Sequence, residues 1–338
     1  MDLFLTFLGT SASVPTAARG TSALLIARGG ARWLVDCGEG TQRQLLRSGL
    51  GLVDLDLVLV THLHGDHYLG LPGLLKTYGL RGRERPLLIV GPPGLVALVD
   101  RLGVVFGTLP FSLELAETGP GELWRGDGAR LEAFPTDHGP RPSLGFALVE
   151  DARPGAFDVA AAVALGVPEG PLWGRLQRGE PVGARDGSPV RPDQVLGPPR
   201  PGRRVVLTGD TRPCEATLAA ARGATVLVHE ATLLDEDRER ARETGHSTAR
   251  EAAALGREAD VRLLALTHLS SRFGPREARR EAEQEFTRVV VPWDFDQIEV
   301  PFPERGDPRL LPAEPTPARR ARTAVASAEP ATVSDDDL

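Results

Sequence analysis

The sequence contains little cysteine, almost no lysine and no long apolar run. Its 338 residues include two cysteines, Cys37 and Cys214, which lie far apart and in no Cys-x-x-Cys pair. Such cysteines predict neither a disulfide framework nor a thiolate metal site, and they suit a reducing compartment. No apolar run approaches the length of a membrane span, and no basic segment precedes the short apolar stretch at the N-terminus. We therefore expect a cytoplasmic protein with no membrane segment.

Positive charge comes almost entirely from arginine, because Lys76 is the single lysine. Guanidinium groups suit bidentate phosphate contacts better than ammonium groups do. A codon preference across a whole genome would give the same composition, so arginine content alone decides nothing. The formal net charge of −7 argues against indiscriminate binding to nucleic acid or membrane, but it is compatible with a local basic patch.

Strand-like and helix-like segments alternate along most of the chain. Apolar and β-branched runs bounded by Gly, Pro or Asp recur from 3–8 to 263–266. Between some of these runs, apolar residues recur at a spacing of three and four, which predicts helices. The pattern predicts a mixed α/β protein built in layers, with a sizeable core. The clearest predicted helices cover 40–48, 69–78, 213–222, 248–259 and 276–285.

Residues 151–201 differ from the rest, being rich in Gly, Pro, Arg and Asp and poor in strand formers. We interpret them as a flexible arm inserted between two parts of one domain, 1–150 and 202–303. If Arg203 and Arg204 at its edge are included, the arm carries eight arginines against six acids. It is therefore the best candidate for holding a polyanion, although a solvated loop of mixed charge fits the composition equally well.

The end of the chain has too few large apolar residues to pack. After about Glu304 it consists mainly of Pro, Ala, Arg and terminal acids. We expect a disordered tail over 304–338.

The clearest chemical signal follows the apolar run 55–60, where THLHGDHYLG occupies 61–70. A single histidine in an apolar setting is usually an ordinary core residue with a hydrogen bond. Three histidines and an aspartate within six positions are typical of a metal site instead. They cannot all share one face of a helix, so we predict a tight turn at the strand end, with Gly65 relaxing the backbone. The candidate ligands here are His62, His64, Asp66 and His67.

Three later segments repeat the pattern of an apolar strand followed by one polar ligand, at His138, Asp210 and His268. Side chains that leave the ends of neighbouring strands converge on one edge of a sheet. Imidazole and carboxylate without thiolate favour zinc first, and manganese or iron would also suit them. Two ions sharing an aspartate would activate a water and bind a phosphate oxygen, which serves hydrolysis.

Two histidines lie in motifs of their own. His229 and Glu230 end an apolar run, and His246 precedes a predicted helix with a capping box at Thr248 and Glu251. A histidine ahead of a helix with a carboxylate in reach is a candidate general acid for a departing alkoxide. The helix N-terminus disfavours imidazolium, so Glu230 and a substrate phosphate would have to keep His246 protonated. A structural histidine at a cap is the alternative interpretation.

HLHGDH followed by isolated His, Asp and His ligands resembles the metallo-β-lactamase superfamily. That resemblance implies a four-layer αβ/βα sandwich with a dinuclear site at its edge. Further motifs together resemble the ribonuclease Z family, endonucleases that trim 3′ trailers from tRNA precursors, over the whole chain up to the tail. These motifs are FLGTSASVPT, DCGEGTQRQ, TDHGPRPSLGF, GVPEGPLWGRLQRGE, TGDTRP, HEAT, HST and THLSSRF.

The resemblance implies two zinc ions per subunit and a homodimer whose substrate is a tRNA precursor. It also implies that the arm binds tRNA away from the cleavage site, where we single out Arg175 and Arg178; we add Arg272 as a further substrate contact. Asp66 would act as general base, and Glu230 with His246 would protonate the leaving 3′ oxygen. The implied ligands are His62, His64 and His138 for one ion, Asp66, His67 and His268 for the other, and Asp210 as a bridge.

The sequence departs from the family pattern at two places. Arg19 is followed by Gly20 where the family usually has an Arg-Asn pair, which leaves open whether CCA-bearing ends are cleaved or rejected. The arm has no lysine, so arginines and backbone would have to bind the RNA. Two other functions compete: a hydrolase of small phosphodiesters or other esters on the same scaffold, and an RNA-binding relative that has lost its metals. The complete ligand set and the HEAT and HST motifs favour the endonuclease.

Overall fold

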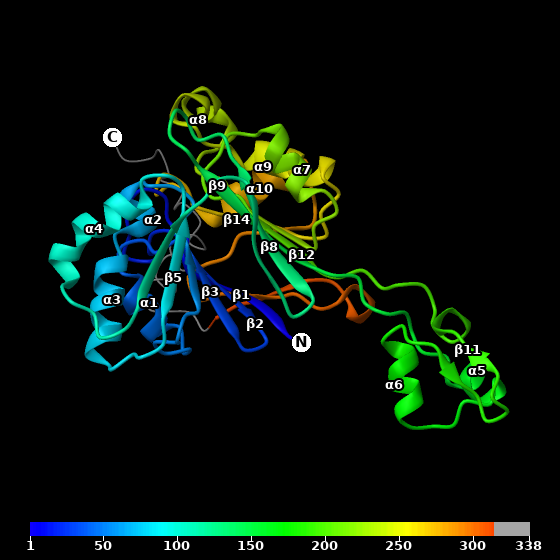
Figure 1. The fold of residues 1–338 in the computed structure, drawn as a ribbon. Helices are drawn as coiled ribbons and strands as arrows, with labels where there is room; N and C mark the ends of the chain where they lie inside the picture. Colours follow the sequence, from blue (N-terminus) through cyan, green and yellow to red (C-terminus); the bar gives the residue numbers. More distant parts are fainter. Residues whose placement is uncertain (314–338) are drawn as a thin grey trace, which may run out of the picture.

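Two β-sheets face each other at the centre of the molecule, and helices cover their outer faces (Figure 1). The computed structural model describes residues 1–313. Buried side chains of both sheets, among them Leu5, Phe7, Leu131 and Phe146, form the core between the sheets. The predicted four-layer α/β sandwich is therefore confirmed.

The first sheet has eight strands, antiparallel from β17 to β3 and parallel from β3 to β6. Apolar side chains of α1, α3 and α4 pack on its outer face, with Leu45, Leu74 and Val99 fully or almost fully buried. In sheet order the strands are β17 (Arg309–Leu311), β16 (Gln297–Glu299), β1 (Leu3–Gly9), β2 (Ala23–Arg28), β3 (Ala31–Val35), β4 (Leu57–Leu59), β5 (Leu87–Gly91) and β6 (Leu113–Glu117). The helices on this side are α1 (Thr41–Arg47), α2 (Gly65–Tyr68), α3 (Leu71–Leu80) and α4 (Leu95–Phe106).

The second sheet has seven strands, parallel from β15 to β12 and antiparallel from β12 to β7. Small residues such as Ala221, Ala253 and Ala278 let α7, α9 and α10 pack closely on it. In sheet order the strands are β15 (Val289–Val290), β14 (Leu264–Thr267), β13 (Val226–Glu230), β12 (Arg204–Leu207), β9 (Leu144–Glu150), β8 (Ala129–Pro135) and β7 (Gly121–Gly126). The helices are α7 (Glu215–Ala221), η2 (Asp235–Asp237), α8 (Arg238–Thr244), α9 (Ala249–Glu258) and α10 (Pro275–Ala282).

Residues 151–201 form a lobe that projects from the body on two extended segments (Figure 1). These segments pair at Arg153↔Arg200 and at Phe157↔Leu196. The lobe has a small core of its own, which composition did not indicate, made of Ala162, Val167, Leu176, Val182, Val190 and Val195. Its elements are α5 (Val159–Ala164), α6 (Pro171–Gln177), β10 (Val182–Gly183), β11 (Pro189–Val190) and η1 (Pro192–Gln194).

The expected excess of positive charge on the arm is wrong. Arg203 is buried in the body, where it pairs with Glu150 at 2.7 Å, and Arg204 begins β12. Residues 151–201 alone carry six arginines and six acids, so their formal charge balances. The interpretation failed because it assigned to the insertion two arginines that belong to the body, Arg203 just before β12 and Arg204 at its first position.

The predicted start of the tail at Glu304 is also wrong. Residues beyond it continue the fold through η3 (Pro303–Arg305) and through β17, which pairs with β16 at the edge of the first sheet. Residues 314–338 of the expected tail lie outside the described part of the chain. Within residues 1–313, the helices are all too short or too polar to cross a membrane.

Candidate metal centre

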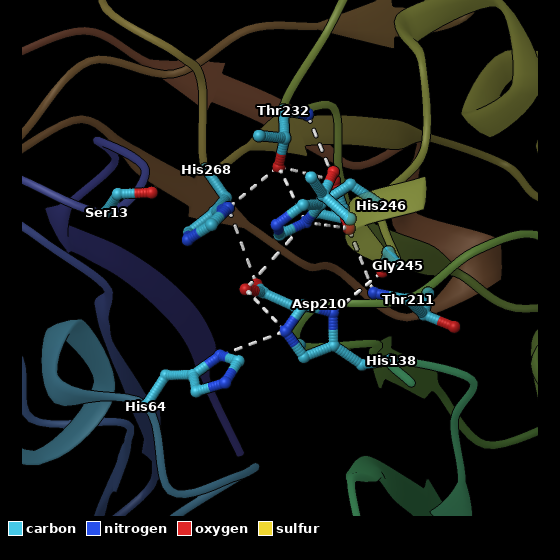
Figure 2. Close-up of polar contacts among 12 residues, drawn as sticks. Ser13, His64, His138, Asp210, Thr211, Thr232, Gly245, His246 and His268 are labelled. Atoms are coloured by element: carbon cyan, nitrogen blue, oxygen red, sulfur yellow. Dashed lines mark hydrogen bonds and ion pairs between the residues drawn. The ribbon is translucent and has the colours of Figure 1, made fainter. Parts of the chain in front are cut away.

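The seven predicted ligands converge where the carboxyl ends of strands from both sheets meet. Figure 2 labels four of them, His64, His138, Asp210 and His268. In one group, His64 Nδ1 lies 3.0 Å from His62 Nε2 and 3.1 Å from His138 Nε2. In the other, Asp66 Oδ2 lies 3.2 Å from His268 Nε2 and 3.6 Å from His67 Nε2. These two groups have the same members as the two sets that the family resemblance implies.

The Asp210 carboxylate lies between the two groups, as expected for a bridge. Its Oδ2 atom is 3.3 Å from His67 Nε2 and 3.7 Å from His62 Nε2, and its Oδ1 atom is 3.5 Å from His268 Nδ1. Asp210 is buried, so its charge is poorly screened and acts strongly on all the surrounding imidazoles.

The predicted tight turn after β4 is a one-turn helix. His64 is the N-cap of α2 in extended conformation, and Asp66 and His67 lie in the single turn that follows. Gly38 permits this packing, because a Cβ there would lie 2.3 Å from the backbone oxygen of Asp66. This short helix therefore places His64 in the first group of ligands and Asp66 and His67 in the second.

The hydrogen bonds behind the ligands leave imidazole lone pairs directed into the centre. His138 Nδ1 donates to the Gly245 carbonyl at 2.7 Å, and His67 Nδ1 donates to Asp36 Oδ2 at 2.7 Å. In the neutral form of each ring the remaining Nε2 atom is an unprotonated acceptor. Burial alone would lower the pKa of His67, but the carboxylates of Asp210 and Asp36 outweigh burial and raise that pKa well above its usual range, so a cation bound there would displace a proton. Among the described residues, His67 Nε2 and Asp210 Oδ1 are buried without a hydrogen-bond partner. Such orphaned acceptors indicate that this donor set fits a divalent cation.

The pKa of His62 supports the same interpretation. Burial lowers this pKa far below its usual range, and the neighbouring His67 lowers it further. A neutral imidazole is the form that binds metal.

His246 and Glu230 form an ion pair beside the ligands, with His246 Nδ1 2.8 Å from Glu230 Oε1. Burial alone would lower the pKa of His246, but the Glu230 carboxylate outweighs burial and raises that pKa to about 9. Glu230 is itself held by N–H groups of Thr211 and Thr232 at 2.9 and 3.0 Å. The predicted capping box of α9 is present behind His246.

The other predicted residues lie elsewhere. His229 is fully buried in β13, where its Nδ1 donates to the Glu230 carbonyl. Arg175 and Arg178 lie on the arm and both pair with Glu180, at 3.0 and 3.2 Å. Arg272 follows β14 and pairs with Asp237 at 3.0 Å.

Asp36 was not assigned a role from the sequence. Its carboxylate accepts from Thr61 N at 2.8 Å and from His67 Nδ1 at 2.7 Å. Asp36 and His268 both have left-handed backbone, with φ of 58° and 55°, a strain that concentrates at functional sites. The sequence did contain a signal for Asp36, because this residue follows the predicted strand 33–35 just as each candidate ligand follows a predicted strand.

The sandwich and its edge centre define a class of metal-dependent proteins, and comparison with known proteins agrees. The family model described as the metallo-β-lactamase superfamily matches residues 16–172. Ribonuclease Z of Halorubrum lacusprofundi is 50% identical, covering 90% of this chain and 99% of its own. Ribonuclease Z of Myxococcus xanthus is 48% identical, covering 89% and 98%. Human tRNase Z, short form, superposes with a TM-score of 0.64 at 29% identity, covering 88% and 99%. The chain belongs to the ribonuclease Z family.

Proposed function

We propose that this chain is a zinc-dependent endoribonuclease that removes the 3′ trailer from tRNA precursors and leaves a 3′-hydroxyl on the tRNA. The observation that carries the proposal is the His246–Glu230 pair at 2.8 Å beside a complete ligand set. A ligand set alone would serve many hydrolases, whereas an adjacent proton donor suits a substrate with a poor leaving group. The names of the relatives point to RNA as that substrate.

Two zinc ions would account for both ligand groups. The sets His62–His64–His138 and Asp66–His67–His268 each place their ligand atoms within 4.8 Å of one another, and Asp210 lies between them. When bound, such ions supply Lewis acidity at the phosphate and make the attacking water more acidic.

The chain's own residues divide the remaining work. Asp66 orients the attacking water and accepts its proton as the bond from oxygen to phosphorus forms. Glu230 holds His246 Nδ1–H, so the proton on the other ring nitrogen is the one available to the leaving group. That proton passes to the 3′ oxygen as its bond to phosphorus breaks, which yields the 3′-hydroxyl and a trailer with a 5′-phosphate.

We assign the arm to binding of the precursor, with Arg175 and Arg178 as phosphate contacts and Arg272 as a contact nearer the centre. Exposed ion pairs such as those with Glu180 and Asp237 are weak, so a phosphate can replace the acid at little cost. We also propose a homodimer, in which one subunit's arm serves the other's centre, acting in the cytoplasm.

The test is incubation of the purified protein with a tRNA precursor carrying a 3′ trailer, with and without a chelator. We expect a mature-length tRNA with a 3′-hydroxyl only when metal is present. Precursors ending with and without CCA would show which end is accepted. Hydrolysis of a small phosphodiester without cleavage of any precursor would favour the second function, a small-diester hydrolase.

Two variants separate the centre from the arm. Asp66→Ala should abolish turnover while tRNA binding survives. Replacing 158–195 by a short Gly-Ser turn keeps the paired Phe157↔Leu196 base, and it should spare hydrolysis of a small diester while tRNA affinity is lost. Equal loss of both activities in the arm variant would contradict the assignment.

A further inference from the structure

A backbone N–H group lies against the proposed general base. Ser13 N donates to Asp66 Oδ2 at 2.8 Å, the same oxygen that lies 3.2 Å from His268 Nε2. Ser13 stands beside His268 in Figure 2, on a loop far from Asp66 in sequence. Its φ of 60° is left-handed, which a serine rarely adopts unless its surroundings hold it.

One side of this loop, residues 10–20, is joined to the segment that carries His268. Ala12 N donates to the Leu269 carbonyl at 3.0 Å, and Leu269 N donates to the Thr10 carbonyl at 3.0 Å. These two bonds therefore attach the start of the loop to the end of β14, next to the ligand His268.

The other anchor of the loop is the buried carboxylate of Asp294, from the segment between β15 and β16. It accepts from the Thr10 hydroxyl at 2.7 Å and from Gly20 N at 2.6 Å, which are the two ends of the loop. Gln44 Nε2 donates to the same carboxylate at 2.6 Å and so connects it to α1. Asp294 is 6% exposed, so water cannot easily replace these contacts.

We infer that Asp294 is a positioning residue for Asp66: it closes the 10–20 loop and thereby keeps the Ser13 N–H on the Asp66 carboxylate. The donor fixes the direction of the carboxylate that must accept the proton of the attacking water. The inference rests on the proposed function, since it assigns Asp294 to the step in which Asp66 acts.

An asparagine can replace Asp294 in this network and an alanine cannot. Its amide oxygen can accept from Gly20 N and Gln44 Nε2. Its NH2 can donate to the Thr10 hydroxyl oxygen, which accepts from Arg19 Nη1 with one lone pair and has the other one available. Burial raises the pKa of Asp294 to about 6, although these donors and the charge of Arg19 lower it. Alanine would leave the Gly20 N–H without an acceptor and release the loop.

The experiment compares Asp294→Ala, Asp294→Asn and the control Asp56→Ala. Asp56 likewise accepts from a backbone N–H, Arg32 N at 2.9 Å, and from a side chain, Arg85 Nη2 at 2.6 Å, but it precedes β4, at the end away from the centre. Two measurements are made: kcat and KM on a chromogenic phosphodiester and on a tRNA precursor, and hydrogen exchange of the Ser13 amide in metal-free protein by NMR.

We expect Asp294→Ala to lower kcat about tenfold or more on both substrates with KM unchanged, as for a lost hydrogen bond to a charged group. Its Ser13 amide should exchange faster, while Asp294→Asn and Asp56→Ala keep both the rate and the protection of the unaltered chain. An unchanged kcat or unchanged Ser13 protection in folded Asp294→Ala would overturn the inference. A variant in which only KM for the precursor changes would also overturn the inference, because it would indicate that the loop binds RNA and does not position Asp66. If the unaltered chain cleaves only the diester, the proposed function fails while the diester data still decide the inference.

Discussion

Asp36→Asn should weaken metal binding without disturbing the backbone. One Asp36 oxygen accepts from Thr61 N at 2.8 Å and the other from His67 Nδ1 at 2.7 Å. In the asparagine, the amide oxygen must serve Thr61 N, so the NH2 group faces His67 Nδ1. His67 then has to accept at Nδ1 and move its proton to Nε2, the atom 3.3 Å from Asp210 Oδ2. A protonated Nε2 cannot ligate a metal.

The magnitude follows from the role of Asp36 behind the ligand. Replacing a group that orients a metal-binding histidine typically costs about 10- to 100-fold in metal affinity, which corresponds to about 1.4–2.7 kcal/mol. Asparagine tolerates left-handed backbone as well as aspartate does, so the φ of 58° at this position should persist.

The assay is competition with a chromogenic chelator, combined with metal analysis of the dialysed protein. Asp127→Asn is the matched control, because Asp127 is also left-handed, with φ of 50°, but lies in the turn between β7 and β8. We expect Asp36→Asn to lose affinity and the control to keep it. Unchanged affinity, with the His67 Nδ1 proton still present by ¹⁵N NMR, would refute the reasoning.

Three further predictions concern the proton donor, the arm and the core. His246→Ala should slow precursor cleavage by about 10²- to 10⁴-fold but should hardly slow a p-nitrophenyl diester, whose leaving group needs no proton; leaving-group dependence measures this. Glu304→Ala removes the carboxylate that pairs with Arg153 and Arg200 at the root of the arm, so KM for the precursor should rise while diester turnover stays unchanged. Glu150→Ala leaves Arg28 and Arg203 buried without their acid and should cost about 3–5 kcal/mol in urea unfolding.

The convergence of the candidate ligands was predictable because their signal is local. His62, His138 and Asp210 each follow a short apolar strand, and the rule that strand ends converge at a sheet edge is general. Their placement in two groups came from family resemblance, and the distances agree with it. The one-turn helix α2 was missed because four residues, GDHY, are too few to show a hydrophobic period, and two of them are the candidate ligands Asp66 and His67.

The errors at the arm and the tail have a common physical cause. Composition described both segments as loop-like, yet Val182 and Val190 close a small core in the arm, and β17 completes an edge of the first sheet. Their order comes from partners distant in sequence, as Glu304 shows by pairing with Arg153 and Arg200.

The sequence did not predict the Ser13 N–H as a donor to Asp66, because the loop that carries Ser13 is held by contacts between the two sheets. His62 follows a strand of the first sheet, whereas His138 and Asp210 follow strands of the second. The centre therefore exists only when the sheets pack face to face, and bonds across that junction must hold the alignment. Ala12 to Leu269 is such a bond, because it ties the end of β1 to the end of β14 through backbone atoms alone. A backbone N–H is present in almost every residue, so the amino-acid sequence does not reveal which one acts as a donor here. Only the three-dimensional structure shows that the 10–20 loop contacts both Asp66, after a strand of the first sheet, and Leu269, beside His268 of the second.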